Sequence, residues 1–202
     1  MRPLRACAIV LPLLGVAACA MPPAAPSVSL PNDAFVGAGD ETRSAIFSTA
    51  AAFSSPSVLA NQPAEAARAV AQLEYLAVEI PTGPRWVGVS PNVTTALVAA
   101  RNEARAALGI APNAPPQAVI DQLYQASRAL RAGDRAAAER SLSPTVFQGG
   151  GASTLSRLAA LPPMPQANQA AVLAQFELWR LDRENNDSGG GPGGGGGGGG
   201  YL

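Results

Sequence analysis

Carboxylates, tyrosines and arginines are the side chains of this 202-residue chain that offer chemistry. The chain has no His, its 14 basic residues are all Arg, and its two Cys, Cys7 and Cys19, lie within the first 20 residues. The absence of His and Lys removes the base of Ser-His-Asp and Cys-His nucleophile systems and the amine of Ser-Lys dyads and Schiff-base lysines. If the first residues are removed by processing at Cys19, the folded part also has no free thiol, and the Cys and His ligands of zinc sites are then missing. A phosphate-binding loop that ends in Gly-Lys-Ser or Gly-Lys-Thr is excluded because there is no Lys.

General acid or base catalysis would therefore fall to carboxylates, whose spacing does not favour it. Glu74 and Glu79 are five residues apart, so we expect them on different faces of one helix, as solvated surface residues. Asp40 and Glu41 stand at an expected helix start, where the helix dipole favours negative charge without any catalytic role. A carboxylate-dependent hydrolase or lyase remains an alternative to a binding function.

Two pairs of residues, each with at least one arginine, are candidate partner contacts. Arg101 and Arg105 are one helical turn apart and could hold an anionic partner, or could simply form a solvated helix face. Arg85 and Trp86 lie in a loop bounded by Pro and Gly, and exposed Trp and Arg are typical anchors of protein interfaces. Alternatively, Trp86 points inward and supplies bulk to a core made largely of small residues.

The first 18 residues are typical of an export signal. Arg2 and Arg5 form a short basic region, and the apolar run over 6–18 is shorter than the ~20 residues that span a bilayer. The sequence Val16-Ala17-Ala18-Cys19 resembles the lipobox of bacterial lipoprotein signals. This resemblance implies cleavage before Cys19, a diacylglycerol thioether on its thiol and acylation of the new amine.

The lipobox resemblance also implies a location. Ala20 is similar to the residue that follows the cysteine in lipoproteins of the outer membrane, so we expect a protein held by acyl chains on the periplasmic side of that membrane. Three acyl chains exceed what stable anchoring requires. Two alternatives remain open: a conventional peptidase could cut after Ala18 or Ala20 and release a soluble periplasmic protein, or the segment could stay as an uncleaved anchor.

The charge balance narrows the class of partner. Cleavage before Cys19 leaves 12 Arg against 14 acids, a net charge of −2. Proteins that bind nucleic acid are usually basic, so nucleic acid is a disfavoured partner. No cofactor and no metal are indicated. We therefore expect a binding or assembly component of the cell envelope, with the membrane as one partner through the lipid anchor and an envelope protein as another.

The chain after the signal divides into a spacer, a single domain and a tail. Residues 19–39 comprise the lipidated Cys and a spacer with four Pro over 21–31, which we expect to be extended and outside the core. Residues 188–202 contain 11 of the 21 glycines and are expected to be disordered. Between them, residues 40–187 are expected to form an all-α domain.

Apolar residues at helical spacing, with Pro, Gly and Asp at the boundaries, predict six or seven helices in a bundle or an array of helical hairpins. The predicted segments cover residues 40–53, 63–80, 91–108, 115–132, 135–142, 153–161 and 167–184. Asp40 and Asp134 are the expected caps, and Gly109 and Gly133 the expected left-handed terminators. The expected buried stripe of the last helix comprises Val172, Leu173, Phe176 and Trp179.

Overall fold

A computed structural model describes residues 27–35 and 39–189 of the chain. The expected signal, Cys19 and nearly all of the expected glycine-rich tail lie outside these residues. Within the described ranges the secondary structure consists of eight α-helices and one short 3-10 helix, with no β-strand beyond an isolated bridge between Ile110 and Phe147. The expectation of an all-α fold is confirmed.

The helix bounds follow the predicted segments closely. In chain order the elements are α1 (Glu41–Ala52), α2 (Pro56–Leu59), α3 (Pro63–Thr82), η1 (Pro84–Trp86), α4 (Pro91–Leu108), α5 (Pro116–Arg131), α6 (Arg135–Ser141), α7 (Gly150–Ala159) and α8 (Pro165–Gly189). The sequence did not predict α2, a single turn that starts at the proline expected only to end α1. The last helix also continues past the expected end at residue 184.

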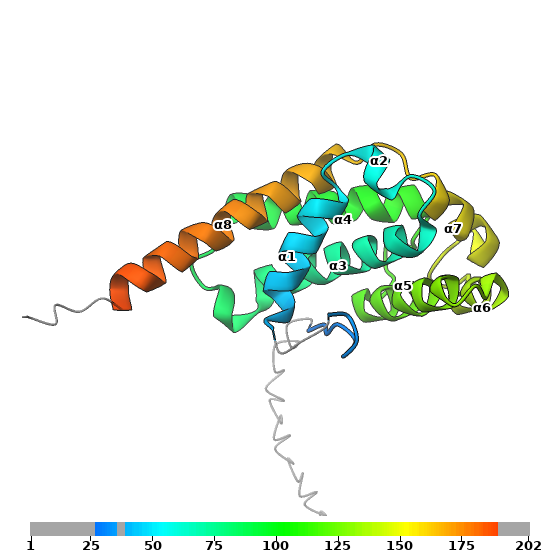
Figure 1. Cartoon of the computed structure of the whole chain (residues 1–202), viewed down its shortest axis with the longest axis horizontal. Helices are drawn as coiled ribbons and strands as arrows, with labels where there is room; N and C mark the ends of the chain where they lie inside the picture. Colours follow the sequence, from blue (N-terminus) through cyan, green and yellow to red (C-terminus); the bar gives the residue numbers. More distant parts are fainter. Residues whose placement is uncertain (1–26, 36–38, 190–202) are drawn as a thin grey trace, which may run out of the picture.

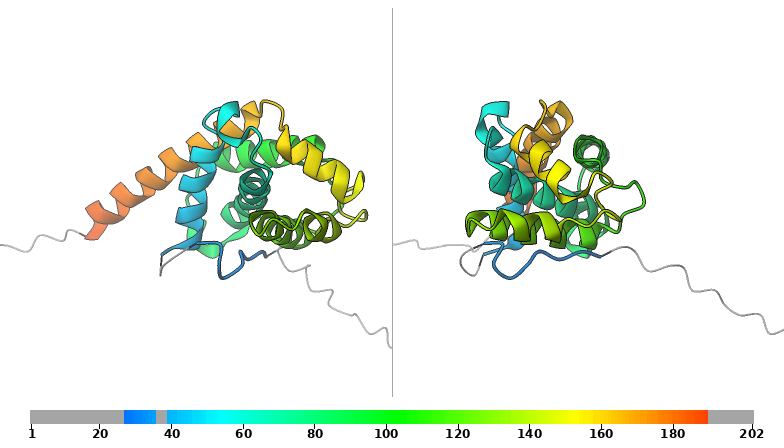
Figure 2. Two further views of the ribbon diagram at one scale, coloured as in Figure 1. Left: turned by 45° about the vertical axis from the view of Figure 1, so that its right-hand side comes forward. Right: turned by 90° about the vertical axis from the view of Figure 1, so that its right-hand side faces the viewer.

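Helix α3 lies at the centre of the domain (Figures 1 and 2). It packs against α1, α4, α5 and α7, while α8 lies along α4 and α1, and α6 contacts α5 and α7. Every residue of α3 from 69 to 78 is buried, and Ala recurs along this stretch. Because Ala has almost no side-chain volume, neighbouring helices can approach α3 on several sides at once.

Local signals in the sequence set the helix ends as expected. The Asp40 carboxylate accepts hydrogen bonds from the Thr42 and Arg43 amides of α1 at 3.0 and 3.2 Å. The Asp134 carboxylate accepts one from the Ala137 amide of α6 at 2.8 Å. Gly109, with φ of 67°, ends α4 in the left-handed region where glycine is favoured. These caps fix where the chain turns between helices.

Residues 27–35 pack against the folded domain, so the expectation that residues 19–39 form a spacer outside the core is wrong for residues 27–35. Leu30 and Ala34 are buried in the core. The Ser29 amide donates to Gln117 of α5 at 2.9 Å, and Arg128 of α5 forms an ion pair with Asp33. The proline content suggested an extended chain, but an extended chain can still place a leucine against a helix.

Candidate functional site

Of the two alternatives for Trp86, an exposed interface anchor or a core residue, the structure shows the core residue. Its side chain is buried in the core, and its indole Nε1 has no hydrogen-bond partner among the described residues. Arg85 is exposed, places its guanidinium 5.1 Å from the centroid of the Trp86 ring and forms an ion pair with Asp40. Partial burial opposes ionisation of Asp40, but Arg85 and the α1 amides hold the pKa of this carboxyl below its ordinary value. Arg85 thus connects the segment after α3 to the start of α1.

Arg101 and Arg105 converge on Glu74, which reaches them from the central helix. The Arg101 Nε donates to Glu74 Oε1 at 2.7 Å, and Arg105 donates from Nε and Nη2 to the two carboxylate oxygens at 3.1 and 2.5 Å. Glu74 is only 2% exposed, so the expectation that it is a solvated surface residue is wrong. Its ion pairs compensate for the cost of burying the charge.

The two arginines differ in what they leave free. Arg105 also donates to the backbone carbonyls of Ala111, Pro112 and Ala114. These bonds and those to Glu74 use all five N–H groups of its guanidinium. Arg105 is therefore committed to holding the loop between α4 and α5 against α3, and it is not available to a partner.

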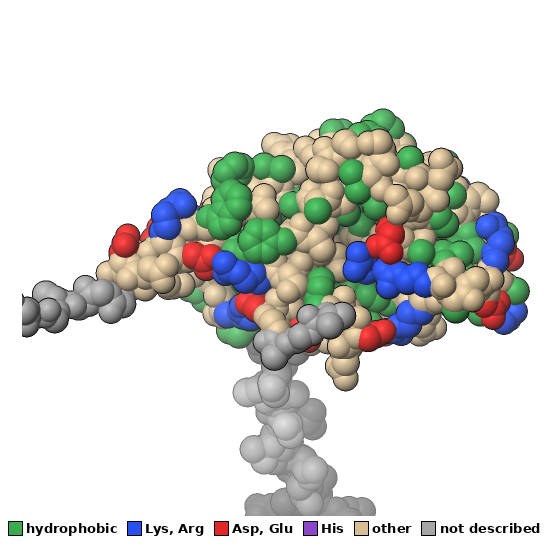
Figure 3. Space-filling model, viewed as in Figure 1, with side chains coloured by type: hydrophobic (Ala, Val, Ile, Leu, Met, Phe, Trp, Pro, Cys, Tyr) green, Lys and Arg blue, Asp and Glu red, His purple; other side chains and the backbone are tan. Residues whose placement is uncertain are grey.

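Three large apolar side chains of α8 face outward. Val172, Phe176 and Trp179 are 36%, 58% and 38% exposed, and Figure 3 shows hydrophobic side chains gathered over α8. The rings of Phe176 and Trp179 meet edge to face with their centroids 5.4 Å apart. The expectation that this stripe is buried is wrong for these three residues, whereas Leu173 is partly buried against the core. We refer to Val172, Phe176 and Trp179 as the α8 aromatic face.

The opposite side of α8 is the buried one, and it is made mainly of alanine. The residues that bury it are Ala167, Ala170, Ala171, Ala174 and Leu178. This helix therefore has an apolar side of small residues and an apolar side of large ones. The small side lies against α4 and α1 because it allows close helix approach.

Polar contacts hold α8 in place along its length. The Glu103 carboxylate of α4 accepts hydrogen bonds from the Gln166 and Ala167 amides in the first turn of α8. Nearer its other end, Arg43 of α1 forms a two-point ion pair with Asp182 at 2.9 and 2.6 Å. The α8 aromatic face is thus presented by a helix anchored on both sides of it.

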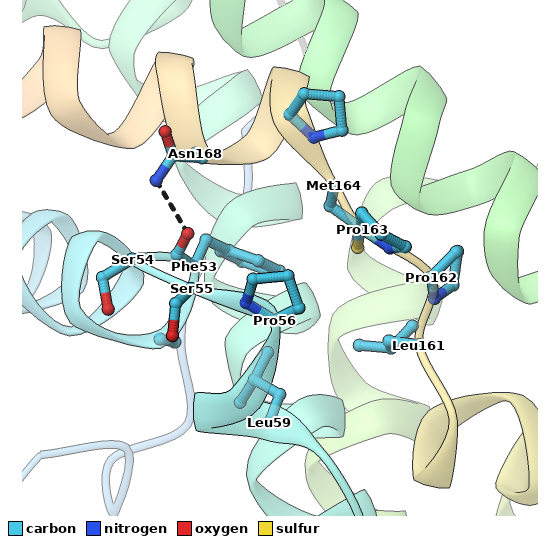
Figure 4. A pocket seen from close by; sticks show the side chains of 12 residues that line it. Phe53, Ser54, Ser55, Pro56, Leu59, Leu161, Pro162, Pro163, Met164 and Asn168 are labelled. Carbon is cyan, nitrogen blue, oxygen red and sulfur yellow. Dashed lines mark hydrogen bonds between the residues drawn. The ribbon is translucent and has the colours of Figure 1, made fainter.

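A cavity of about 310 Å³ lies between the α1–α2 turn and the segment that leads into α8 (Figure 4). Phe53, Leu59 and Met164 form apolar walls, and Asn168 donates from its side-chain amide to the Phe53 carbonyl at 2.8 Å. No ionisable side chain lines this cavity. Its volume is at the lower end of the roughly 300–1,000 Å³ typical of ligand sites.

The described residues contain no group of three or more His, Cys, Asp or Glu side chains placed to hold a metal ion. None of their helices is long and apolar enough to cross a membrane.

Comparison with known proteins gave no match. No family model, no curated protein and no solved structure is similar to this chain. The functional argument therefore depends on the residues and the geometry described above.

Proposed function

We propose that this chain is a lipid-anchored binding component of the bacterial cell envelope, which engages another envelope protein through the α8 aromatic face. The observation that carries the binding function is the exposure of Val172, Phe176 and Trp179 on one side of a helix whose other side is fully packed. Exposed apolar residues are common singly, but adjacent large ones on a rigid element mark interaction sites.

The composition of this face suits a protein partner. Trp is among the residues most enriched at the centre of protein interfaces, and Phe is also enriched there. Because α8 is already fixed by Glu103 and by the Arg43–Asp182 pair, little backbone order would be lost on binding. A preformed aromatic pair of this kind can fill a pocket on a partner.

The charges on α8 favour a protein over an anionic membrane surface. From Glu177 to Asp187 the helix carries four acids and two arginines. A helix that lies on anionic lipid usually has a basic polar side. An anionic lipid surface would repel the excess of acids on α8. The aromatic face therefore has a different role from the proposed acyl anchor.

The anchor itself is proposed from the lipobox resemblance, and it places the protein on the periplasmic side of the outer membrane. It is tested by labelling cells with a radioactive fatty acid and fractionating their membranes. Cys19→Ser is expected to abolish labelling and processing and to release the protein from the membrane fraction. Cys7→Ser is the matched control and is expected to change none of these. Labelling that survives Cys19→Ser would overturn the lipid anchor.

The α8 aromatic face is tested with Phe176→Ser and Trp179→Ser combined, against Val58→Ser, which removes an apolar side chain 38% exposed on α2. The double variant is expected to fold with some loss of stability, because Trp179 is only 38% exposed and its buried part contributes to the fold. Once circular dichroism shows that the variant is folded, it is expected to lose an envelope function that Val58→Ser retains. Wild-type function in the double variant would contradict the proposal.

The alternative of a carboxylate-dependent enzyme is separated by a different set of substitutions. Each exposed Asp and Glu of the helical domain is replaced in turn by Asn or Gln. The binding proposal expects that no single exposed carboxylate outside α8 is indispensable. One essential carboxylate in a variant that still folds would favour the enzyme and would overturn the proposed function.

A further inference from the structure

A second cavity, of about 250 Å³, lies beside the C-terminal half of α4. The residues that line it are Arg101, Asn102, Arg105, Ala106, Ile110 and Pro112. Ile110 and Pro112 belong to the loop that Arg105 holds in place. The lining therefore combines two arginines and an asparagine with three apolar residues.

The charges around this cavity do not balance. Two arginines meet one carboxylate, because Glu74 is the acid with which both Arg101 and Arg105 pair. The Glu74 and Arg105 side chains are 2% and 7% exposed, and the Arg101 side chain is 24% exposed. A net positive charge thus remains in a partly desolvated place, where electrostatic attraction is stronger than in water.

Arg101 is the arginine whose positive charge is less fully compensated by hydrogen bonds. Its Nε donates to Glu74, whereas neither of its terminal nitrogens has a hydrogen-bond partner in the part of the chain that the structure describes. These two nitrogens carry four N–H groups. Arg105 uses all five N–H groups in bonds within the protein, whereas the four terminal N–H groups of Arg101 can donate to a ligand.

We propose that this cavity binds a carboxylate that carries a short apolar group, with the terminal nitrogens of Arg101 as its main contact. A carboxylate has the single negative charge that balances the site, and its two oxygens match the planar fork of a guanidinium. Ala106, Ile110 and Pro112 would contact the apolar group. The carboxylate can belong to a free acid or to the C-terminus of a peptide, because the same contacts serve both.

The experiment is an NMR titration of the purified protein with isobutyrate and with acetyl-dialanine, using chloride at equal ionic strength as a reference. Saturable shifts are expected for the Arg101 side chain and for the amides of residues 101–112. For so few ligand atoms we expect a Kd on the order of 1 mM. If only isobutyrate binds, the ligand is a free acid. If acetyl-dialanine binds more tightly than isobutyrate, the ligand is the C-terminus of a peptide.

Substitutions make the test specific to Arg101. Arg101→Gln is expected to weaken binding at least ten-fold, and Arg101→Lys several-fold because the fork is lost. Arg140→Gln on α6, an exposed arginine, is the matched control and should bind as the wild type does. Equal weakening by Arg140→Gln, or wild-type shifts that chloride reproduces, would overturn the proposal. If Arg101→Gln does not fold, the wild-type comparison with chloride still decides.

Discussion

Replacing Arg105 with Ala is expected to destabilise the fold strongly, because Arg105 is the main partner of a buried charge. Glu74 is 2% exposed and receives three hydrogen bonds from arginines, of which Arg105 supplies two. Removing one partner of a buried ion pair costs about 3–5 kcal/mol of unfolding free energy. The variant leaves Arg101 as the remaining partner of Glu74, and it frees three carbonyls of the α4–α5 loop.

An exposed ion pair of the same residue types provides the control. Arg131 of α5 donates to Glu65 of α3 at 2.9 Å, with the two side chains 47% and 34% exposed. Exposed pairs contribute about 0–1 kcal/mol, so Arg131→Ala should change stability by no more than that. The two variants test burial, since both remove one arginine from a pair with glutamate.

The assay is urea unfolding of the purified protein followed by circular dichroism at 222 nm. The expected result is a difference of at least about 2 kcal/mol between Arg105→Ala and Arg131→Ala. Equal unfolding free energies for the two variants would refute the view that Glu74, Arg101 and Arg105, the Glu74 cluster, stabilise the contact between α3 and α4.

Two further predictions concern packing and pH. A Cβ at Gly151 would lie 1.9 Å from the Glu139 carbonyl oxygen, so Gly151→Ala should lower the free energy of unfolding by about 3 kcal/mol. Gly133 has a φ of 76° and open space around it, so Gly133→Ala should lower it by only about 1 kcal/mol. Similar thermal unfolding of both variants would contradict this difference. The Arg180 guanidinium lowers the pKa of Glu177. The stabilisation of the fold by this pair is therefore fully present above a pH of ~4.3, the ordinary glutamate pKa, and is lost as the pH falls through the lowered pKa. Glu177→Gln should therefore destabilise the protein at pH 7 and much less at pH 3; an equal effect at both would refute the pairing.

The helices and their ends could be predicted because the signals for them are local. Asp40 and Asp134 each accept from amides two or three residues further along the chain, and Gly109 needs only its own backbone freedom. The Glu74 cluster could not be found in this way. Glu74 and Arg105 are 31 residues apart, and each looks like a surface residue on its own helix until α3 and α4 are packed together.

The error on α8 has a physical cause in residue size. Both sides of this helix are apolar, and a scale of hydrophobicity selects the side with Phe176 and Trp179. Packing selected the side with Ala170 and Ala174, since small residues bring α8 closer to α4 and α1. A helix with an alanine side and an aromatic side should therefore raise two hypotheses, of which one leaves the aromatic residues available to a partner.

The most direct test of the proposed binding function is photocrosslinking in intact cells. A photoreactive phenylalanine analogue is placed at position 176, and at position 58 as the control. Position 176 is expected to form an adduct with one identified envelope protein, position 58 is not, and Trp179→Ser should weaken the adduct. Adducts only with lipid or with a second copy of this chain, the same adduct from position 58, or no adduct would contradict the proposal.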